Sequence, residues 1–208
     1  MKTSNKGFDQ CGNAQAVANE QQIVIAADVT DQANDVRQTV PMVNQTIDNL
    51  DAAGVTENVK AFTADARYFS EENMVAVDEN DRIDDAFIAT GRQNHNDVMP
   101  DSPKGRPPND LTPKQKMARR NRTKKGKAEY ARRKVIIEPV FSQIKAGLGF
   151  RDFLLRSLEK KKGEWNLVCL VHNLLKLFTN VTTDVDGSEE HVPAVVYKYE
   201  TQITKHSL

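Results

Sequence analysis

A single carboxylate, Glu138, lies inside a strongly basic run of the sequence, YARRKVIIEPVFSQIK at residues 130–145. Three consecutive cations precede it, and Lys145 follows it. A helix that only binds DNA phosphates gains affinity from cations and has no use for this acid. A site that holds a phosphate and cleaves beside it with a metal ion needs both kinds of side chain. The run therefore raises the question of metal-dependent phosphoryl transfer.

The spacing of four residues in this run predicts a shared helix face. Tyr130, Lys134, Glu138 and Lys145 fall within about 80° of one another at 100° per residue. A solvated face with a Lys134–Glu138 salt bridge would give the same pattern. The neighbours of Glu138 favour the site interpretation, because a carboxylate in apolar surroundings needs a cation or a metal. These neighbours are Val135, Ile136, Ile137, Val140, Phe141 and Ile144.

A second carboxylate, Asp65, follows the apolar stretch NVKAFTAD at residues 58–65, which is typical of a strand. In open α/β sheets, ligands bind outside the carboxyl ends of the strands. Asp65 is therefore placed to hold a metal ion. An Asp at this position is more often a turn residue or a helix cap, and the sequence leaves that alternative open.

The run at residues 130–145 resembles the C-terminal signature of DDE-type transposases from bacterial insertion sequences. In that family a Tyr, a basic residue, the catalytic Glu and a Lys share one helix, with six residues between Glu and Lys. Glu138 and Lys145 keep this gap. Three other stretches agree in the same order: NAQAVANEQQIVIAADVTDQANDVRQTVPM, ADARYFSEEN and GFRDFLLRSLEKKKGEWNLVCLVHNLLKLF. The resemblance covers most of residues 7–178.

The resemblance implies a ribonuclease H-like α/β fold, with a mixed sheet in the order 3-2-1-4-5 flanked by helices. It implies that Asp65 and Glu138 are catalytic residues and ligands of Mg²⁺ in a two-metal site. The expected partner is double-stranded DNA at transposon ends, the expected location is the bacterial cytoplasm, and a homo-oligomer is expected. The residues expected to bind DNA are Tyr130, Arg132, Arg133, Lys134, Lys145, Arg119, Arg120, Arg122, Lys124 and Lys125.

Several positions depart from the family pattern. The first catalytic Asp belongs on the first strand, and Asp9 is the nearest candidate here. Arg67 stands where a Gly is usual, and Gly12 and Asn19 stand where Tyr and Asp are usual. We therefore expect an N-terminally truncated chain that lacks the first, central strand and is inactive alone. Without that strand, the flanking strands would expose unpaired backbone groups and the chain would be partly unfolded.

Two other interpretations remain open at this stage. A non-enzymatic fragment could bind DNA, or pair with a full-length transposase and inhibit it. The chain could also be a pseudogene product without a function. The residues themselves do not separate these readings.

The elements around these residues alternate between strand and helix, which predicts an α/β sheet. Residues 14–18 and 21–30 read as a hairpin, 58–65 and 84–90 as strands, and 70–80 as a helix. A helix follows the hairpin, with Pro41 expected to kink or restart it. We expect a remnant of the catalytic domain at 1–91, a Pro-rich linker or insertion at 92–113, helices at 114–180 that complete the domain, and an atypical tail at 181–208. The helix at about 164–178 is apolar nearly all round and is expected to be buried.

Charge is distributed unevenly along the 208 residues, although 29 basic and 29 acidic residues cancel. Residues 1–113 contain 9 basic and 19 acidic residues, a balance of −10, and residues 114–134 contain 11 and 1, a balance of +10. The second block is expected to face nucleic acid. Two cysteines are too few for a disulfide framework or a zinc site. The sequence shows neither a signal peptide nor an apolar run long enough to span a membrane, which favours a soluble protein.

Overall fold

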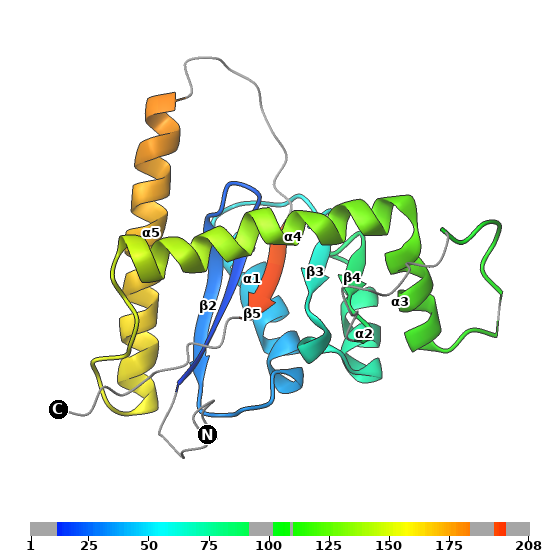
Figure 1. Ribbon diagram of the computed structural model, residues 1–208, viewed down its shortest axis with the longest axis horizontal. Coiled ribbons are helices and arrows are strands. Elements are labelled where there is room, and N and C mark those ends of the chain that lie inside the picture. Colours follow the sequence, from blue (N-terminus) through cyan, green and yellow to red (C-terminus); the bar gives the residue numbers. More distant parts are fainter. Residues whose placement is uncertain (1–11, 92–101, 109, 184–193, 199–208) are drawn as a thin grey trace.

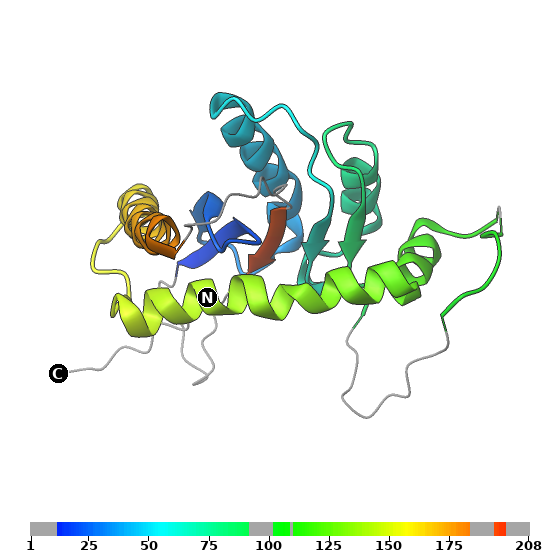
Figure 2. The same cartoon turned by 90° about the horizontal axis from the view of Figure 1, so that it is seen from above.

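A computed structural model describes residues 12–91, 102–108, 110–183 and 194–198. Its strands form a layer with α1 and α2 on one face and α4 across the other (Figures 1 and 2). One apolar cluster joins the strands to α1 and α2, and a second joins the first two strands to α4 and α5. The mixed α/β class expected from the sequence is confirmed.

Strands β1 (Asn13–Asn19) and β2 (Val24–Thr30) form the expected antiparallel hairpin. Ala16 pairs with Ala27, and the register shifts between Val17 and Ala18. Every residue of β1 is buried, including its polar ones. The alanines of β1 face α4 and α5 in the second cluster. Their small side chains let both helices pack close to the sheet.

Helix α1 (Thr39–Ala52) follows a short 3₁₀ turn, η1 (Val36–Gln38). Of the two outcomes expected at Pro41, a kink or a restart, the helix restarts: the 3₁₀ turn ends at Gln38 and α1 begins at Thr39. Pro41 is the third residue of α1, and the first backbone N–H groups of a helix have no carbonyl partner within it. The missing N–H of proline therefore costs nothing here. Gly54, with φ of 78°, adopts the left-handed conformation just after the helix.

The next elements continue the expected alternation. Strand β3 (Phe62–Ala64) leads through the 3₁₀ turn η2 (Ala66–Tyr68) into α2 (Glu71–Asp78) and then β4 (Ala86–Ile88). Ser70 caps α2 by accepting a hydrogen bond from the Asn73 backbone N–H at 3.0 Å. Strands β3 and β4 pair in parallel, with Phe62 opposite Ala86.

A strand also lies between β1 and β3, where the sequence led us to expect a gap. This strand, β5 (Ala194–Lys198), comes from the segment expected to be an atypical tail. It pairs antiparallel with β1, with Val17 opposite Val196, and lies beside β3 (Figures 1 and 2). The expectation of an unpaired β1 edge is therefore wrong. The hydrogen bonds define two sheets among the described residues, β2-β1-β5 and β3-β4, instead of one five-stranded sheet.

The basic half of the chain forms two consecutive helices. Helix α3 (Pro113–Arg122) starts with proline at its first position and with a capping box between Thr112 and Gln115. Helix α4 (Lys124–Ser142) crosses the strands and runs into a π-helical turn, η3 (Gln143–Gly147). Pro139 lies inside α4 without ending it. The Val135 carbonyl, which has no backbone donor at Pro139, accepts a hydrogen bond from a side chain instead, as described below.

Helix α5 (Leu158–Thr183) packs one face on β2 and the second apolar cluster. Trp165, Cys169 and His172 are at most 4% exposed on that face. The opposite face is exposed, so the expected burial of this helix on all sides is wrong. None of the helices among the described residues combines the length and apolarity needed to cross a membrane.

Candidate nucleic-acid interface and metal ligands

Asp65 lies directly after β3, at the carboxyl end of the strand. Its carboxylate accepts a hydrogen bond from the Ala66 backbone N–H at 2.6 Å and caps the η2 turn. The sequence left open that Asp65 is a helix cap, and capping is one role that it has in the structure. About two fifths of the side chain (39%) is exposed.

Helix α4 brings Arg133 to Asp65. Arg133 Nη1 lies 3.4 Å from Asp65 Oδ1 and donates to the Tyr130 hydroxyl at 3.1 Å. The guanidinium also lies over the Tyr130 ring, 5.0 Å from its centroid. Burial raises the pKa of the Tyr130 hydroxyl, and the positive charge of Arg133 opposes that rise. Two predicted site residues of α4 thus meet Asp65, a predicted site residue far away in sequence, at the carboxyl end of β3.

The turn after Asp65 is held by buried polar side chains that the sequence analysis did not single out. The Tyr68 hydroxyl donates to Gln15 Oε1 on β1, and the Tyr68 carbonyl accepts from Thr39 and Asn73 at 3.0 and 2.9 Å. Gln15 is 1% exposed. The signal in the sequence was the alternation of alanine with other residues in NAQAVAN. The structure shows that this strand is buried on both sides.

Glu138 is exposed, in contrast to the apolar surroundings that the sequence analysis gave it. Its apolar neighbours Ile136, Ile137 and Val140 point into the second cluster, and Val135 is 64% exposed. At 100° per residue, Glu138 lies about 130° from the centre of that apolar stripe. The site interpretation therefore loses its argument from burial.

Glu138 and Arg133 are five residues apart, which is about 7.5 Å along a helix axis. Arg133, the α4 residue that pairs with Asp65, thus lies more than one helical turn before Glu138. Within the part of the chain that the structure describes, no three His, Cys, Asp or Glu residues gather closely enough to hold a metal ion. The described residues do not fit a two-metal site, because one carboxylate is paired with an arginine and a third is missing. Asp9 lies outside the described residues.

Lys145 lies on the π-helical turn that follows α4. A π turn is wider than an α turn, so its side chain departs from the ideal α-helical position used in the sequence analysis. Burial lowers the pKa of the Lys145 ammonium. The six-residue gap from Glu138 to Lys145 is present in the sequence, but a change of helix type lies within it.

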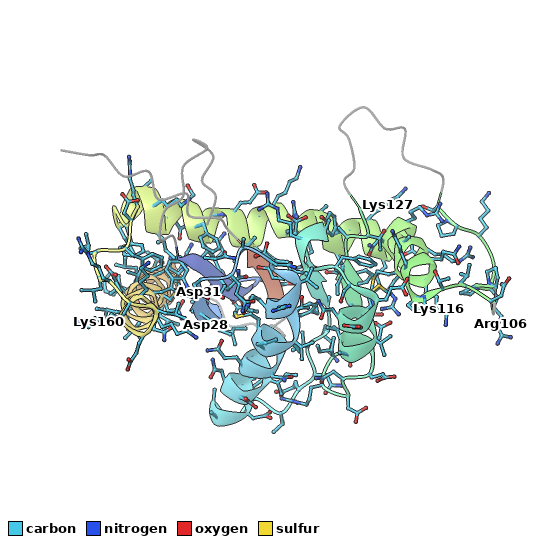
Figure 3. All side chains as sticks on the ribbon, turned by 90° about the horizontal axis from the view of Figure 1, so that it is seen from below. Asp28, Asp31, Arg106, Lys116, Lys127 and Lys160 are labelled. Atoms are coloured by element: carbon cyan, nitrogen blue, oxygen red, sulfur yellow. The ribbon has the colours of Figure 1, made fainter. Side chains whose placement is uncertain are left out.

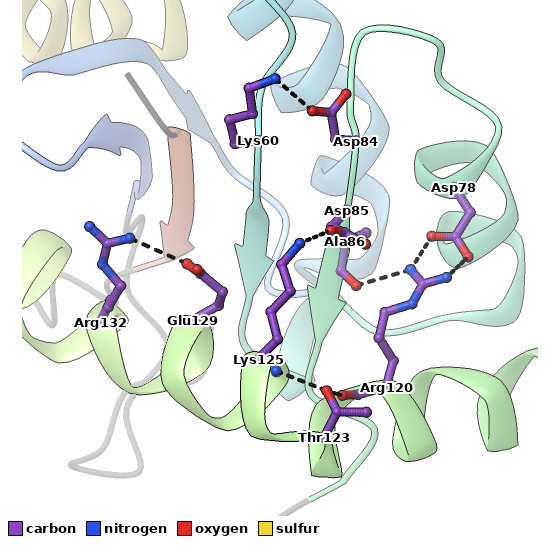
Figure 4. A network of polar contacts seen from close by, with 11 residues as sticks. Lys60, Asp78, Asp84, Asp85, Ala86, Arg120, Thr123, Lys125, Glu129 and Arg132 are labelled. Atoms are coloured by element: carbon purple, nitrogen blue, oxygen red, sulfur yellow. Dashed lines mark hydrogen bonds and ion pairs between the residues drawn. The ribbon is translucent and has the colours of Figure 1, made fainter. Parts of the chain in front are cut away.

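Several cations of the basic block at residues 114–134 form ion pairs and hydrogen bonds with other residues of the protein (Figure 4). Arg120 forms two bonds to the Asp78 carboxylate, at 2.6 and 3.1 Å, and a third to the Ala86 carbonyl. Lys125 pairs with Asp85, which raises the pKa of the Lys125 ammonium. These cations fasten α3 and α4 to the acidic first half of the chain. A sum of charges along the sequence does not reveal such pairs.

Three more arginines of the predicted DNA-binding set are bonded to other residues of the protein or partly buried in it. Arg119 donates to the carbonyls of Lys104 and Gly105, and Arg132 pairs with Glu20 and Glu129. The Nε atom of Arg122 is buried and has no hydrogen-bond partner among the described residues. Lys124 and Lys134 are exposed and form no ion pair with a described residue. Lys116 and Lys127 lie at the same end of the molecule as Arg106 (Figure 3).

Comparison with known proteins locates the family signal in these helices. Residues 108–178 match the family model of the transposase DDE domain. The matched region contains α3, α4 and most of α5, and with them Tyr130, Glu138 and Lys145, whereas Asp65 lies outside it. The match supports a relation to DDE-type transposases. Neither the curated proteins nor the solved structures gave a significant match.

Proposed function

We propose that this chain is a transposase-derived protein of bacterial insertion-sequence origin that binds double-stranded DNA at transposon ends and does not cut DNA alone. The family match over α3 to α5 supports DNA as the substrate class. The exposed ammonium groups of Lys124 and Lys134 on α4 are available to phosphates. The alternative is full metal-dependent cleavage and strand transfer.

The observation that carries this proposal is the ion pair between Asp65 and Arg133. The resemblance assigns Asp65 and Glu138 to Mg²⁺, which would activate the attacking water and stabilise the leaving oxygen. A guanidinium beside Asp65 neutralises the charge that would attract the metal. The same guanidinium, stacked on Tyr130, is well suited to a DNA phosphate. The proposal therefore favours binding, and it includes pairing with a full-length transposase as the inhibitory variant of the same role.

Titration of a fluorescent DNA duplex at several salt concentrations tests the binding. The slope of log K against log salt is about −0.9 per phosphate contact. In the variant Lys124→Gln/Lys134→Gln, we expect weaker binding and a slope that is shallower by up to about 2. Arg120 and Lys125 are left unchanged, because their substitution would break the pairs with Asp78 and Asp85.

A matched control removes the same charge elsewhere. Lys60, before β3, forms an exposed pair with Asp84, and Lys160 lies at the start of α5, at the end of the molecule opposite Lys116 and Lys127 (Figure 3). The variant Lys60→Gln/Lys160→Gln should keep the wild-type slope. Equal slopes for all three proteins would contradict the proposed interface. Nicking of a supercoiled plasmid with Mg²⁺, abolished by Asp65→Asn, would contradict the proposal that the chain does not cut.

A further inference from the structure

The outer face of α5 carries a row of large apolar side chains. Leu167, Leu170, Leu174 and Leu177 are 50–61% exposed and recur at spacings of three, four and three residues. This is the spacing by which one helix packs along another. Val171 and Leu175, 38% and 52% exposed, widen the row. We refer to these six residues as the leucine face.

The leucine face carries no charge. Between Asn166 and Leu177 the single charged residue is Lys176, and its ammonium turns the other way, to the Gln22 side chain at 2.5 Å. Trp165, Cys169 and His172 fill the opposite side of the helix, which is buried on β2. A helix with one side on the core normally presents polar side chains on its other side. An apolar row of this size on a soluble domain is typical of an interaction surface.

The remaining segments of the chain have few side chains with which to cover this face. Residues 184–193 contain two large apolar residues, Val185 and Val192. Residues 199–208 contain Tyr199, Ile203 and Leu208, residues 1–11 contain Met1 and Phe8, and residues 92–101 contain Val98 and Met99. None of these segments repeats apolar residues at the three-four-three spacing of the leucine face. Helix α5 of a second copy does.

We propose that two copies of this chain associate through their leucine faces, with the α5 helices antiparallel about a two-fold axis near His172. This arrangement places Leu167 opposite the partner's Leu177 and Leu170 opposite the partner's Leu174. At 100° per residue, Lys160 lies on the same side of α5 as the leucine face. A parallel arrangement would bring the two copies of Lys160 together, whereas the antiparallel one separates them.

The size of the leucine face suits this partner. Six side chains at 38–61% exposure present apolar area on the order of several hundred Å², most of the ~800 Å² that each partner contributes to a standard interface. An isologous contact uses the same patch twice, so one exposed row satisfies both copies. The proposal does not rest on DNA binding, and its test contains no DNA.

Sedimentation equilibrium of the full chain at micromolar concentration is the test. We expect the mass of two chains for the wild type and of one chain for Leu170→Lys/Leu174→Lys. Both leucines are exposed, so the variant should keep the wild-type circular dichroism and still unfold cooperatively, at a lower midpoint because the stabilising partner is lost. The control Leu154→Lys changes a residue that is 84% exposed but precedes α5, and it should remain a dimer. A monomeric wild type, or a dimeric double variant, would overturn the proposal.

Cysteine cross-linking tests the orientation of the two helices. In the antiparallel arrangement, Leu167→Cys/Leu177→Cys should form a disulfide between copies under oxidation, whereas Leu167→Cys alone should not. Cys169 is buried and its thiol pKa is raised to about 12 by that burial, so it should not interfere. Cys11→Ser in all variants removes the other thiol. Efficient cross-linking of Leu167→Cys alone would overturn the antiparallel arrangement.

Discussion

His172 lies in α5 with its Nε2 atom 2.9 Å from the backbone carbonyl oxygen of Gln22. A carbonyl can only accept a hydrogen bond, so Nε2 carries a proton. Burial lowers the pKa of the imidazole below its ordinary 6.5, the Gln22 carbonyl opposes this shift, and the Lys176 charge adds to it. In the folded state His172 therefore binds its second proton at a lower pH than it does in the unfolded state.

The stability of the protein should reflect this resistance. Above about pH 6.5 His172 is neutral in both states, and below it the unfolded state binds a proton first. The free energy of unfolding should therefore fall as the pH drops from roughly 7.5 to 5.5. His172→Gln keeps a donor for the Gln22 carbonyl but cannot titrate, so it should reduce this fall. Urea unfolding at both pH values measures it, and an identical fall in both proteins would refute the assignment.

Residue types and spacing singled out several side chains that the fold brings together. Asp65 was singled out from its place after a strand, and Arg133, bonded to the Tyr130 hydroxyl, lies 3.4 Å from the Asp65 carboxylate. The exposure of Glu138 was available from the helix period and was missed, because its apolar neighbours were counted without their angles. The pairing of Arg120 with Asp78 was not predictable, because 42 residues separate them and only the fold brings them together.

At the scale of elements, α4 shows how a long-range contact overrides a local rule. Pro139 has no N–H for the Val135 carbonyl four residues earlier, which normally bends or ends a helix. The Gln22 side chain in the β1–β2 turn donates to that carbonyl at 2.9 Å. The same side chain also contacts Gln143 and Lys176. The hairpin tip thus replaces the lost bond and joins α4 to α5.

A double-mutant cycle can isolate this replacement. Gln22→Ala should destabilise the protein by about 1 kcal/mol, because the Val135 carbonyl loses its protein donor. Pro139→Ala restores a backbone N–H for that carbonyl. In that background the loss from Gln22→Ala should be smaller by about 0.5 kcal/mol or more. Urea unfolding of the four proteins gives the coupling, and a coupling near zero would show that the bond does not support the helix.

Periodicity predicted most elements, because each follows from its own residues. The hairpin, α1, α2 and the capping box of α3 all carry local signals of this kind. The position of β5 does not. AVVYK has the composition of a strand, but its partner in β1 lies almost the whole chain away. Pairing over such a distance is set by the edge that remains open.

At the scale of the whole molecule, complementary halves of the chain hold the fold together. The acidic first half supplies Asp65, Asp78 and Asp85 to cations of α3 and α4. The C-terminal strand β5 covers the edge of β1 that would otherwise face β3. The expectation that the chain is partly unfolded assumed that nothing occupies this position. With β5 present, the full chain should unfold cooperatively.

Removal of β5 tests this account of the sheet. A chain ending at Thr183 leaves the backbone N–H and C=O groups along one edge of β1 without strand partners, between β1 and β3. Native stability is only about 5–15 kcal/mol, so this loss should abolish the cooperative urea transition.

A chain ending at Lys198 keeps β5 and should unfold like the full protein. Val196→Pro, which places a proline in the middle of β5 opposite Val17, should lower the midpoint. If the chain ending at Thr183 unfolds at the midpoint of the full chain, β1 and β3 hold together without the strand between them.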